Sequence, residues 1–325
     1  MQLTQLATQL RQTLGIAQKQ DIQLAAQYLP SSTEQTIRLG DDCAAIRQGD
    51  RYLLLAAEGL LPHLVTAEPW FAGWCAVMVN VSDIYAMGGE PIAVVDTLWS
   101  PSKAAGQALW QGMQAAAQAY HVPIVGGHTN CHSDYTALSV AILGQAEHLI
   151  TSFDAQPGDV LLMAIDLRGQ PYKQYPFWNA ATMADPQRLQ GDLALLPQIA
   201  AAGWCRAGKD ISMGGVLGTA LMLLETSGCG AVIDLDKIPQ PANMDLLAWL
   251  QHFPSFGFLL AVQPAHVEQV CAAFAGRGLV CGAIGQVDAS PALKVRLRSA
   301  QCQRQSGSET VVLWDWTEQP LMGFR

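Results

Sequence analysis

The chain has little charge and no long apolar run. Only 14% of its 325 residues are Asp, Glu, Lys or Arg, whereas 50% are hydrophobic. No stretch is long and apolar enough to span a membrane, and residues 1–14 lack the apolar centre of a signal peptide. A formal net charge of -9 makes nucleic acids and anionic membranes poor partners. We therefore expect a cytoplasmic globular protein with no membrane or nucleic-acid partner.

Several signatures of catalysis and metal binding are also missing from the sequence. The chain has neither a G-x-x-x-x-G-K-[ST] phosphate loop nor the protein-kinase signature set, and it has no G-x-S-x-G nucleophile elbow. The eight cysteines include no C-x-x-C pair, so we expect reduced, mostly buried thiols, as is usual in the cytoplasm. If the protein binds ATP, it does so without a P-loop.

Apolar periodicity indicates that helices and strands alternate along both halves of the chain. The helices expected are 3–14, 21–29, 71–87, 104–119, 192–202, 214–227, 243–252 and 264–275. The strands expected are 52–57, 92–98, 122–125, 137–144, 160–165, 231–235, 257–262, 279–287 and 311–314. This order and the length predict an α+β or α/β protein with two domains, 1–148 and 149–325, divided at the polar segment 146–158.

The most informative stretch is 80–91, which reads Asn-Val-Ser-Asp-Ile-Tyr-Ala-Met-Gly-Gly-Glu-Pro. An apolar helical run leads into Asp83, and two glycines and a proline then end the helix. Because an unpaired buried charge is costly, Asp83 needs a partner, and a metal ion is a common one. Asn80 could support Asp83 through a hydrogen bond. The alternative is a helix-end Asp that binds a backbone amide.

Further acidic side chains lie upstream of Asp83. Gly40, Asp41 and Asp42 stand where a strand begins. Adjacent carboxylates ionise together readily only near positive charge, which Mg²⁺ would supply to hard oxygen ligands. Glu58 ends an apolar strand, which is a usual place for a site. An exposed Asp-rich turn and a solvated strand end are the respective alternatives.

A glycine pair follows the strand expected at 122–125. The segment reads Gly126-Gly127-His128-Thr129-Asn130-Cys131-His132. Such a pair can present backbone amides to a phosphate, and His128 could bind a metal, a phosphate or a substrate. A transition-metal site with Cys131 and His132 stays open, although the spacing fits no common zinc pattern. A polar turn is the simpler interpretation.

A second glycine pair opens the helix expected at 214–227. The segment reads Lys209-Asp210-Ile211-Ser212-Met213-Gly214-Gly215. Asp210 could ligate a metal, and a helix N-terminus favours anions. An ordinary Ser or Asp cap is the alternative.

Two lysines are further candidates for contacts with a substrate. Lys19, which follows Gly15, could bind phosphate from a mobile lid or begin a solvated helix. Lys173 lies in the aromatic segment 168–180, which either lines a substrate pocket or packs as an aromatic cluster.

Taken in order, these motifs resemble the superfamily of aminoimidazole-ribonucleotide synthetase, the PurM-like proteins. Residues 80–91 and 126–128 are similar to selenophosphate synthetase, and residues 40–46 to thiamine-monophosphate kinase. Residues 210–215 resemble formylglycinamidine-ribonucleotide synthetase and the hydrogenase-maturation protein HypE. The resemblance implies an N-terminal domain that dimerises through its sheet into a β-barrel. It also implies a C-terminal α/β domain that covers an ATP cleft.

The resemblance further implies ATP bound through several Mg²⁺ ions, and phosphoryl transfer to, or ATP-driven activation of, a small molecule. The metal ligands would be Asp41, Asp42, Glu58, Asp83 and Asp210. The ATP contacts would be Gly40, Asn80, Gly126, Gly127, Thr129, Ser212, Gly214 and Gly215. His128 and Lys19 are the candidate catalytic residues. Glu58 stands where relatives usually have Asp, so its longer side chain changes the geometry.

Other departures bear on the activity. His128 stands where thiamine-monophosphate kinase has Asp, and Met213 where that kinase has another Asp. The first cysteine, Cys43, lies inside the metal motif, whereas selenophosphate synthetases carry a reactive Cys or selenocysteine in a glycine-rich N-terminal segment. The chain fits best among uncharacterised relatives of aminoimidazole-ribonucleotide synthetase.

We therefore expect an ATP- and Mg²⁺-dependent phosphotransferase or synthetase with an unidentified small-molecule acceptor. One alternative is a non-catalytic nucleotide-binding dimeric scaffold. Another is an activity like that of selenophosphate synthetase or of thiamine-monophosphate kinase.

Overall fold

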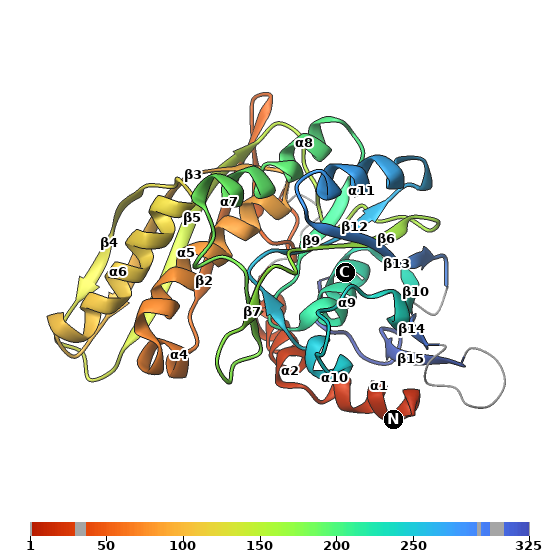
Figure 1. Ribbon diagram of the computed structural model, residues 1–325, viewed down its shortest axis with the longest axis horizontal. Coiled ribbons are helices and arrows are strands. Elements are labelled where there is room, and N and C mark those ends of the chain that lie inside the picture. Colours follow the sequence, from red (N-terminus) through yellow and green to blue (C-terminus); the bar gives the residue numbers. More distant parts are fainter. Residues whose placement is uncertain (1, 30–36, 291–293, 300–308, 325) are drawn as a thin grey trace. The chain divides into compact units, whose positions relative to one another are not determined.

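The computed structural model describes residues 2–29, 37–290, 294–299 and 309–324 (Figure 1). The chain forms two units, and neither is continuous in sequence. The first unit comprises 42–149 and 181–201, and the second comprises 1–41, 150–180 and 202–325. These units differ from the predicted segments 1–148 and 149–325 because 1–41 joins the later part of the chain and 181–201 joins the earlier part. The domain boundary expected between residues 148 and 149 stays a prediction.

The first unit contains a five-stranded sheet with the order β1-β2-β5-β3-β4. Its strands are β1 (Ala44–Gln48), β2 (Arg51–Gly59), β3 (Glu90–Trp99), β4 (Ile124–Asn130) and β5 (Ala137–Ala146). Neighbouring strands are antiparallel except β3 and β4, which run parallel. Within the described residues the sheet is open, with β1 and β4 at its edges. A closed barrel is therefore not formed by these strands alone, and the dimeric barrel stays a prediction.

Helices of the first unit pack against this sheet and against one another. They are α4 (Pro62–Ala67), α5 (Pro69–Ala86), α6 (Lys103–Ala119), α7 (Pro186–Leu193) and α8 (Leu195–Ala201). The apolar sequence of α5 is explained by its position, because α5 packs against β2, β3 and β5 on one side and α6 on another. A Cβ atom on Gly73 of α5 would fall on the carbonyl oxygen of Leu109, and one on Gly112 of α6 on that of Trp70. Only glycine therefore permits this close helix crossing.

The second unit is built on a seven-stranded sheet with the order β15-β14-β10-β13-β6-β12-β9. These strands are β6 (Val160–Ile165), β9 (Ala207–Asp210), β10 (Gly230–Asp234), β12 (Gly257–Val262), β13 (Val280–Asp288), β14 (Lys294–Ser299) and β15 (Glu309–Asp315). A small three-stranded sheet contains β7 (Gln170–Pro171), β8 (Phe177–Asn179) and β11 (Phe253–Pro254). The interior strands β6 and β12 are buried along almost their whole length, which explains why they read as continuous apolar runs.

Helices of the second unit come from both ends of the chain. They are α1 (Leu3–Arg11), α2 (Leu14–Gln20), α3 (Ile22–Tyr28), α9 (Gly215–Ser227), α10 (Leu246–Trp249) and α11 (Val267–Ala275), with 3₁₀ turns η1 (Leu235–Lys237) and η2 (Pro264–His266). The apolar faces of α1 and α9 share one hydrophobic core with β6, β10 and β15. The amino-terminal helix is thus part of the core of the later half of the chain.

Several predicted boundaries were wrong. The helix expected at 192–202 corresponds to α8, most of α7 was not expected, and the helix expected at 243–252 is reduced to α10. The strand expected at 122–125 extends to Asn130 as β4. The sequence pattern did not indicate α4, β9 or β14, which are short elements whose formation depends on their neighbours in the fold.

The described cysteines are all free thiols, and four of them, Cys43, Cys75, Cys205 and Cys229, are buried. This agrees with the expected reduced and mostly buried thiols. Among the described helices, none combines the length and the apolarity that crossing a membrane requires.

Candidate functional site

Asp42 and Asp83 lie together in the first unit. Asp42 precedes β1, and Asp83 lies in the last turn of α5. A carboxylate oxygen of one lies within 4.8 Å of a carboxylate oxygen of the other. Asp83 is buried and Asp42 half-buried. Because two carboxylates at this separation repel each other when ionised, the pair suits a bound cation.

Asn80 lies one turn before Asp83 on the same helix, three residues away, so the two share a face. Its side chain is fully buried, and its amide nitrogen donates to the carbonyl oxygen of Ala76 at 2.8 Å. Within the described residues, the Asn80 Oδ1 atom meets no hydrogen-bond partner. A buried oxygen of this kind is normally satisfied by water or an ion. The oxygen-rich set Asn80, Asp42 and Asp83 therefore fits Mg²⁺ and its hydration shell.

Asp41 already has a structural contact in the second unit. Its Oδ2 atom accepts the backbone N–H of Ser152 at 2.9 Å, and the carbonyl oxygen of Gly40 accepts the Ser152 hydroxyl at 3.4 Å. Gly40 has a φ of +107°, a conformation that favours glycine. Metal ligation by Asp41 and an ATP contact by Gly40 stay predictions.

Glu58 lies near the carboxyl end of β2, as expected, with an exposed side chain. The hydroxyl of Ser139 on the neighbouring β5 donates to the Glu58 carbonyl oxygen at 2.9 Å. This contact involves the backbone of Glu58, so metal ligation by the Glu58 carboxylate stays a prediction.

The strand expected to end at residue 125 continues through Gly126–Asn130 as β4, so these residues do not form the polar turn that was the simpler interpretation. Gly126, Gly127, His128 and Thr129 pair in parallel with β3, and His128 lies opposite Thr97. An extended strand spreads its amides along an edge and does not gather them around a phosphate. ATP contacts by Gly126, Gly127 and Thr129, which the resemblance implies, stay predictions. His128 is exposed, with its ring centroid 6.1 Å from that of Trp99.

The transition-metal alternative also fails on geometry. Within the part of the chain that the structure describes, the ligand atoms of His128, Cys131 and His132 do not gather within 4.8 Å of one another. Asn130 instead accepts the His132 backbone N–H at 2.8 Å through Oδ1 and forms a local turn.

Asp210 ends β9 in the second unit and is buried. The Thr219 hydroxyl of α9 donates to the Asp210 carbonyl oxygen at 3.2 Å and accepts the Ser212 N–H at 3.3 Å. Gly214 is the N-cap of α9, as expected. Gly215 has a φ of +64°, and a Cβ on it would fall on the carbonyl oxygen of Leu250. Asp210 thus stands beside a real helix N-terminus, whereas metal binding by Asp210 and ATP contacts by Ser212, Gly214 and Gly215 stay predictions.

Lys19 does not lie on a glycine-flanked loop. It is half-buried near the end of α2, and Gly15 is a residue of the same helix. A Cβ on Gly15 would fall on the carbonyl oxygen of Met213, so α2 packs against the segment that precedes α9. A catalytic Lys19 would therefore act from a packed helix rather than from a lid.

Asp96 was not singled out from the sequence. It lies on β3 between Val94 and Leu98, on the buried face, and is 3% exposed. Neither of its carboxyl oxygens meets a hydrogen-bond partner of good geometry within the described residues. Burial raises the pKa of Asp96, an effect that the residue's own backbone N–H and then the nearby His128 partly offset. The period of two in Val94-Asp96-Leu98 is the sequence signal that could have revealed this buried carboxyl.

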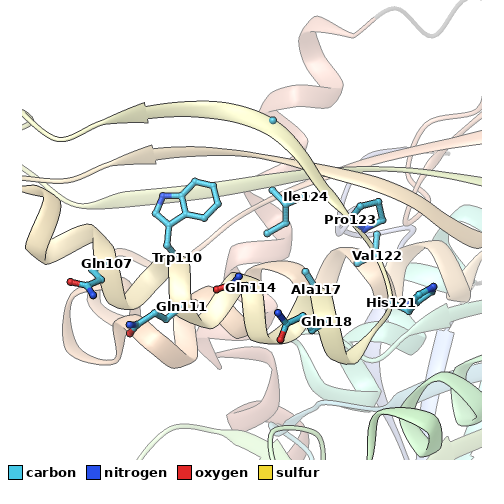
Figure 2. Close-up of a pocket in the computed structure, with 11 residues that line it drawn as sticks. Gln107, Trp110, Gln111, Gln114, Ala117, Gln118, His121, Val122, Pro123 and Ile124 are labelled. Carbon is cyan, nitrogen blue, oxygen red and sulfur yellow. The ribbon is translucent and has the colours of Figure 1, made fainter.

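A groove of ≈ 920 Å³ lies between α6 and β4 (Figure 2). Trp110 projects from α6 toward the strands, and four glutamines lie along the helix: Gln107, Gln111, Gln114 and Gln118. Gly126 lines the groove, whereas Asp42 and Asp83 do not. The groove is therefore separate from the carboxylate pair.

Comparisons with known proteins agree with the resemblance of the motifs. The model of the AIR synthase related protein, N-terminal domain, matches residues 40–146, and that of the C-terminal domain matches residues 156–298. The chain is 55% identical over 326 residues to the uncharacterized protein sll0787 of Synechocystis sp., covering 99% of this chain and 98% of that protein. It is 31% identical over 216 residues to thiamine-monophosphate kinase of Pyrococcus horikoshii, covering 62% of this chain and 67% of the kinase.

A similar solved structure is T. maritima PurL complexed with ATP. The TM-score is 0.75 at 17% sequence identity, over 95% of this chain and 52% of PurL. The chain thus spans about half the length of PurL, and a likeness at this identity concerns the fold. It confirms the expected two-domain α+β PurM-like fold.

Proposed function

The chain belongs to the family of AIR synthase related proteins, and on that premise we propose that it is an ATP- and Mg²⁺-dependent phosphotransferase or synthetase acting on a small molecule. The observation that carries this proposal is the pairing of Asp42 and Asp83 within 4.8 Å in the first unit, beside the buried Asn80. Relatives in the comparisons include a kinase and a synthase, and PurL has been seen with ATP.

In this proposal, Asp42 and Asp83 would hold the cation, and the buried Oδ1 atom of Asn80 would accept a hydrogen bond beside it. When bound, Mg²⁺ would supply the positive charge that neutralises the phosphates and the transferred group. Within the second unit, Asp210 at the end of β9 stays a candidate metal ligand, and the first amides of α9 favour an anion by their orientation. His128 and Lys19 remain our candidates for orienting or deprotonating the acceptor.

Calorimetric titration with ATP and Mg²⁺ tests this assignment. We expect the wild type to bind ATP only when the divalent cation is present, and Asp83→Asn to lower the affinity by about tenfold or more, or about 1.4 kcal/mol. Asp50→Asn is the matched control, because Asp50 is exposed in the turn between β1 and β2 of the same unit. Absence of ATP binding by the wild type would contradict the proposal, and unchanged binding by Asp83→Asn would remove Asp83 from it.

We further propose that the protein is a homodimer, as the resemblance implies. The sheet face opposite α5 and α6 carries exposed apolar side chains, with Leu55 48% and Val95 41% exposed. Leu55 lies opposite Leu143 and Val95 opposite Ala141, so these residues form one apolar surface across three strands. An apolar surface of this kind is typical of a protein interface.

Light scattering after size exclusion tests the dimer. We expect the wild type to elute as a dimer and Val95→Glu as a monomer, because a charge on the apolar face would be desolvated in the dimer. Met183→Glu is the control, since Met183 is 93% exposed and belongs to none of the strands. A monomeric wild type would refute this part of the proposal.

A non-catalytic nucleotide-binding scaffold is the second candidate, and it is motivated by Glu58 and Met213, which depart from the residues of related kinases. It predicts ATP binding without release of ADP or phosphate across a panel of acceptors.

His128 and Met213 still distinguish the chain from thiamine-monophosphate kinase, and the acceptor of any transfer stays unidentified. The free thiols fit the cytoplasmic location that we propose.

A further inference from the structure

We propose that residues 321–324, called the strap below, position Asp41, and that Glu225 is the positioning residue that holds the strap. This inference deepens the proposed function and rests on it, because it concerns the geometry of a candidate metal ligand. Every contact in the argument lies within the second unit.

Glu225 anchors the strap through its carboxylate. It lies in the last turn of α9 and is 2% exposed. Its two oxygens accept the backbone N–H groups of Leu321 at 2.8 Å and Met322 at 2.7 Å, and Oε1 also accepts that of Gly323 at 3.4 Å. Hydrogen bonds to an ionised acceptor are roughly twice as strong as neutral ones. A buried carboxylate thus fixes the backbone of three consecutive strap residues.

The strap places Phe324 directly against Gly40. A Cβ atom on Gly40 would lie 3.0 Å from the Phe324 Cβ and 3.1 Å from the Thr226 Cγ2, which is closer than nearly all real contacts. Gly40 therefore lies close beside both the strap and α9, with no room for a side chain between them. Because the next residue is Asp41, this contact restricts the backbone from which the Asp41 side chain projects.

The same turn of α9 also holds the other side of Asp41. The hydroxyls of Thr226 and Ser227 donate to the carbonyl oxygen of Ser152 at 2.6 and 2.9 Å. Ser152 in turn donates its backbone N–H to Asp41 Oδ2 at 2.9 Å. Glu225, Thr226 and Ser227 are consecutive, so one turn of helix fixes both the backbone before Asp41 and the carboxylate itself.

This arrangement matters because metal ligands need fixed orientation, and the residues behind them supply it. With Oδ2 held by Ser152 and Gly40 held by Phe324, the Asp41 carboxylate has a defined direction before any cation arrives. Loss of the Glu225 anchor should loosen Gly40 while leaving Asp41 chemically intact. The expected signature is therefore weaker cation binding with the ligand itself still present.

The first test measures the clamp without any ligand. Hydrogen exchange resolved to the Ser152 amide should be about tenfold faster in Glu225→Gln, because the amide that replaces the carboxylate presents donors to the strap N–H groups. Glu318→Gln is the matched control, with the same change of charge at an exposed position near the strap. Unchanged Ser152 exchange in Glu225→Gln would overturn the inference.

The second test links the strap to the site through the Mg²⁺ dependence of ATP binding, measured by calorimetry. We expect Glu225→Gln to raise the Mg²⁺ concentration for half-maximal ATP binding about tenfold. In an Asp41→Asn background the same substitution should add little, because the two changes act through one ligand. Full additivity, or no change in Glu225→Gln, would overturn the inference.

The two tests separate the inference from the proposed function. If the wild type binds no ATP, the proposed function fails, while the exchange of Ser152 still reports on the strap. If Glu225→Gln does not fold, Phe324→Ala replaces it, since it keeps the Glu225 anchor and removes only the ring that covers Gly40. Phe324→Ala should then show the same faster exchange at Ser152, and wild-type exchange in that variant would refute the role of the strap.

Discussion

The crossing of α5 and α6 gives a sharp prediction about stability, and α5 is the helix that carries Asn80 and Asp83. We expect Gly112→Ala to destabilise the first unit. The added Cβ would fall on the carbonyl oxygen of Trp70 and also lie 2.8 Å from the Trp74 backbone nitrogen. Both contacts are with main-chain atoms, so no side-chain rotation relieves them, and the two helices must separate.

The magnitude follows from two opposing effects. Alanine stabilises a helix interior over glycine by about 1 kcal/mol. Forcing an extra carbon into a packed core costs typically about 1–3 kcal/mol, and the upper end applies where backbone must move. The net effect expected for Gly112→Ala is a loss of about 2 kcal/mol in the free energy of unfolding.

Gly106→Ala is the matched control on the same helix. A Cβ there would lie 3.4 Å from a Leu98 methyl carbon and 3.6 Å from the Ser100 side chain, which is ordinary contact. This variant should be neutral or more stable by up to about 1 kcal/mol. Urea unfolding of both variants measures the difference, with a midpoint lowered by roughly 1 M for Gly112→Ala. Equal midpoints for the two variants would refute the close crossing.

Two further predictions concern titrating groups. Asp96→Asn should stabilise the protein at pH 7.5 and have little effect at pH 4. Burial raises the pKa of Asp96 in the folded state, so ionisation of this carboxyl destabilises the folded protein. This destabilisation begins as the pH rises above about 4 and is complete above the folded-state pKa. Urea midpoints at the two pH values measure this, and a gain independent of pH would contradict it. Burial raises the pKa of the Cys205 thiol to about 12, so iodoacetamide at pH 8 should modify the half-exposed Cys131 well before Cys205, as read by mass spectrometry. Equal rates would show that Cys205 is not buried.

The parts of the fold that could be predicted are those whose pattern reflects burial directly. The apolar runs of α5 and α9 and the strands β6 and β12 are buried almost throughout, so their composition alone indicated them. The helix start at Gly214 and the position of Asp83 near a helix end also followed from local rules of helix termination.

The rest depended on contacts between distant residues. Residues 126–130 have the composition of a turn, yet pairing with β3 makes them a strand at the edge of the sheet. Gly15 reads as a helix break, but it lies within α2 because its missing side chain lets α2 approach Met213. No local pattern indicates that Ser152 meets Asp41 across more than 100 positions, since that contact exists only in the folded chain.

The candidate site could also be predicted only in part from the sequence. Asp42 and Asp83 were both expected as ligands, and the structure brings them together. The sequence could not indicate that the Asn80 Oδ1 atom and the Asp96 carboxyl lack hydrogen-bond partners among the described residues, because this depends on which groups surround them in the folded chain.

The interleaved order of the two units limits how this protein can be cut. A fragment that stops at 148 would lack residues 181–201, and with them α7 and α8. It would lose the Gln190 amide that donates to Ala119 at 2.9 Å at the end of α6, and the apolar side chains of Leu189, Leu193, Leu196 and Ile199 that are buried in the intact protein. Expressed separately, the first half would expose an apolar surface, and the second half would carry α7 and α8 without their packing partners. Biochemical work should therefore use the whole chain or co-express the two halves.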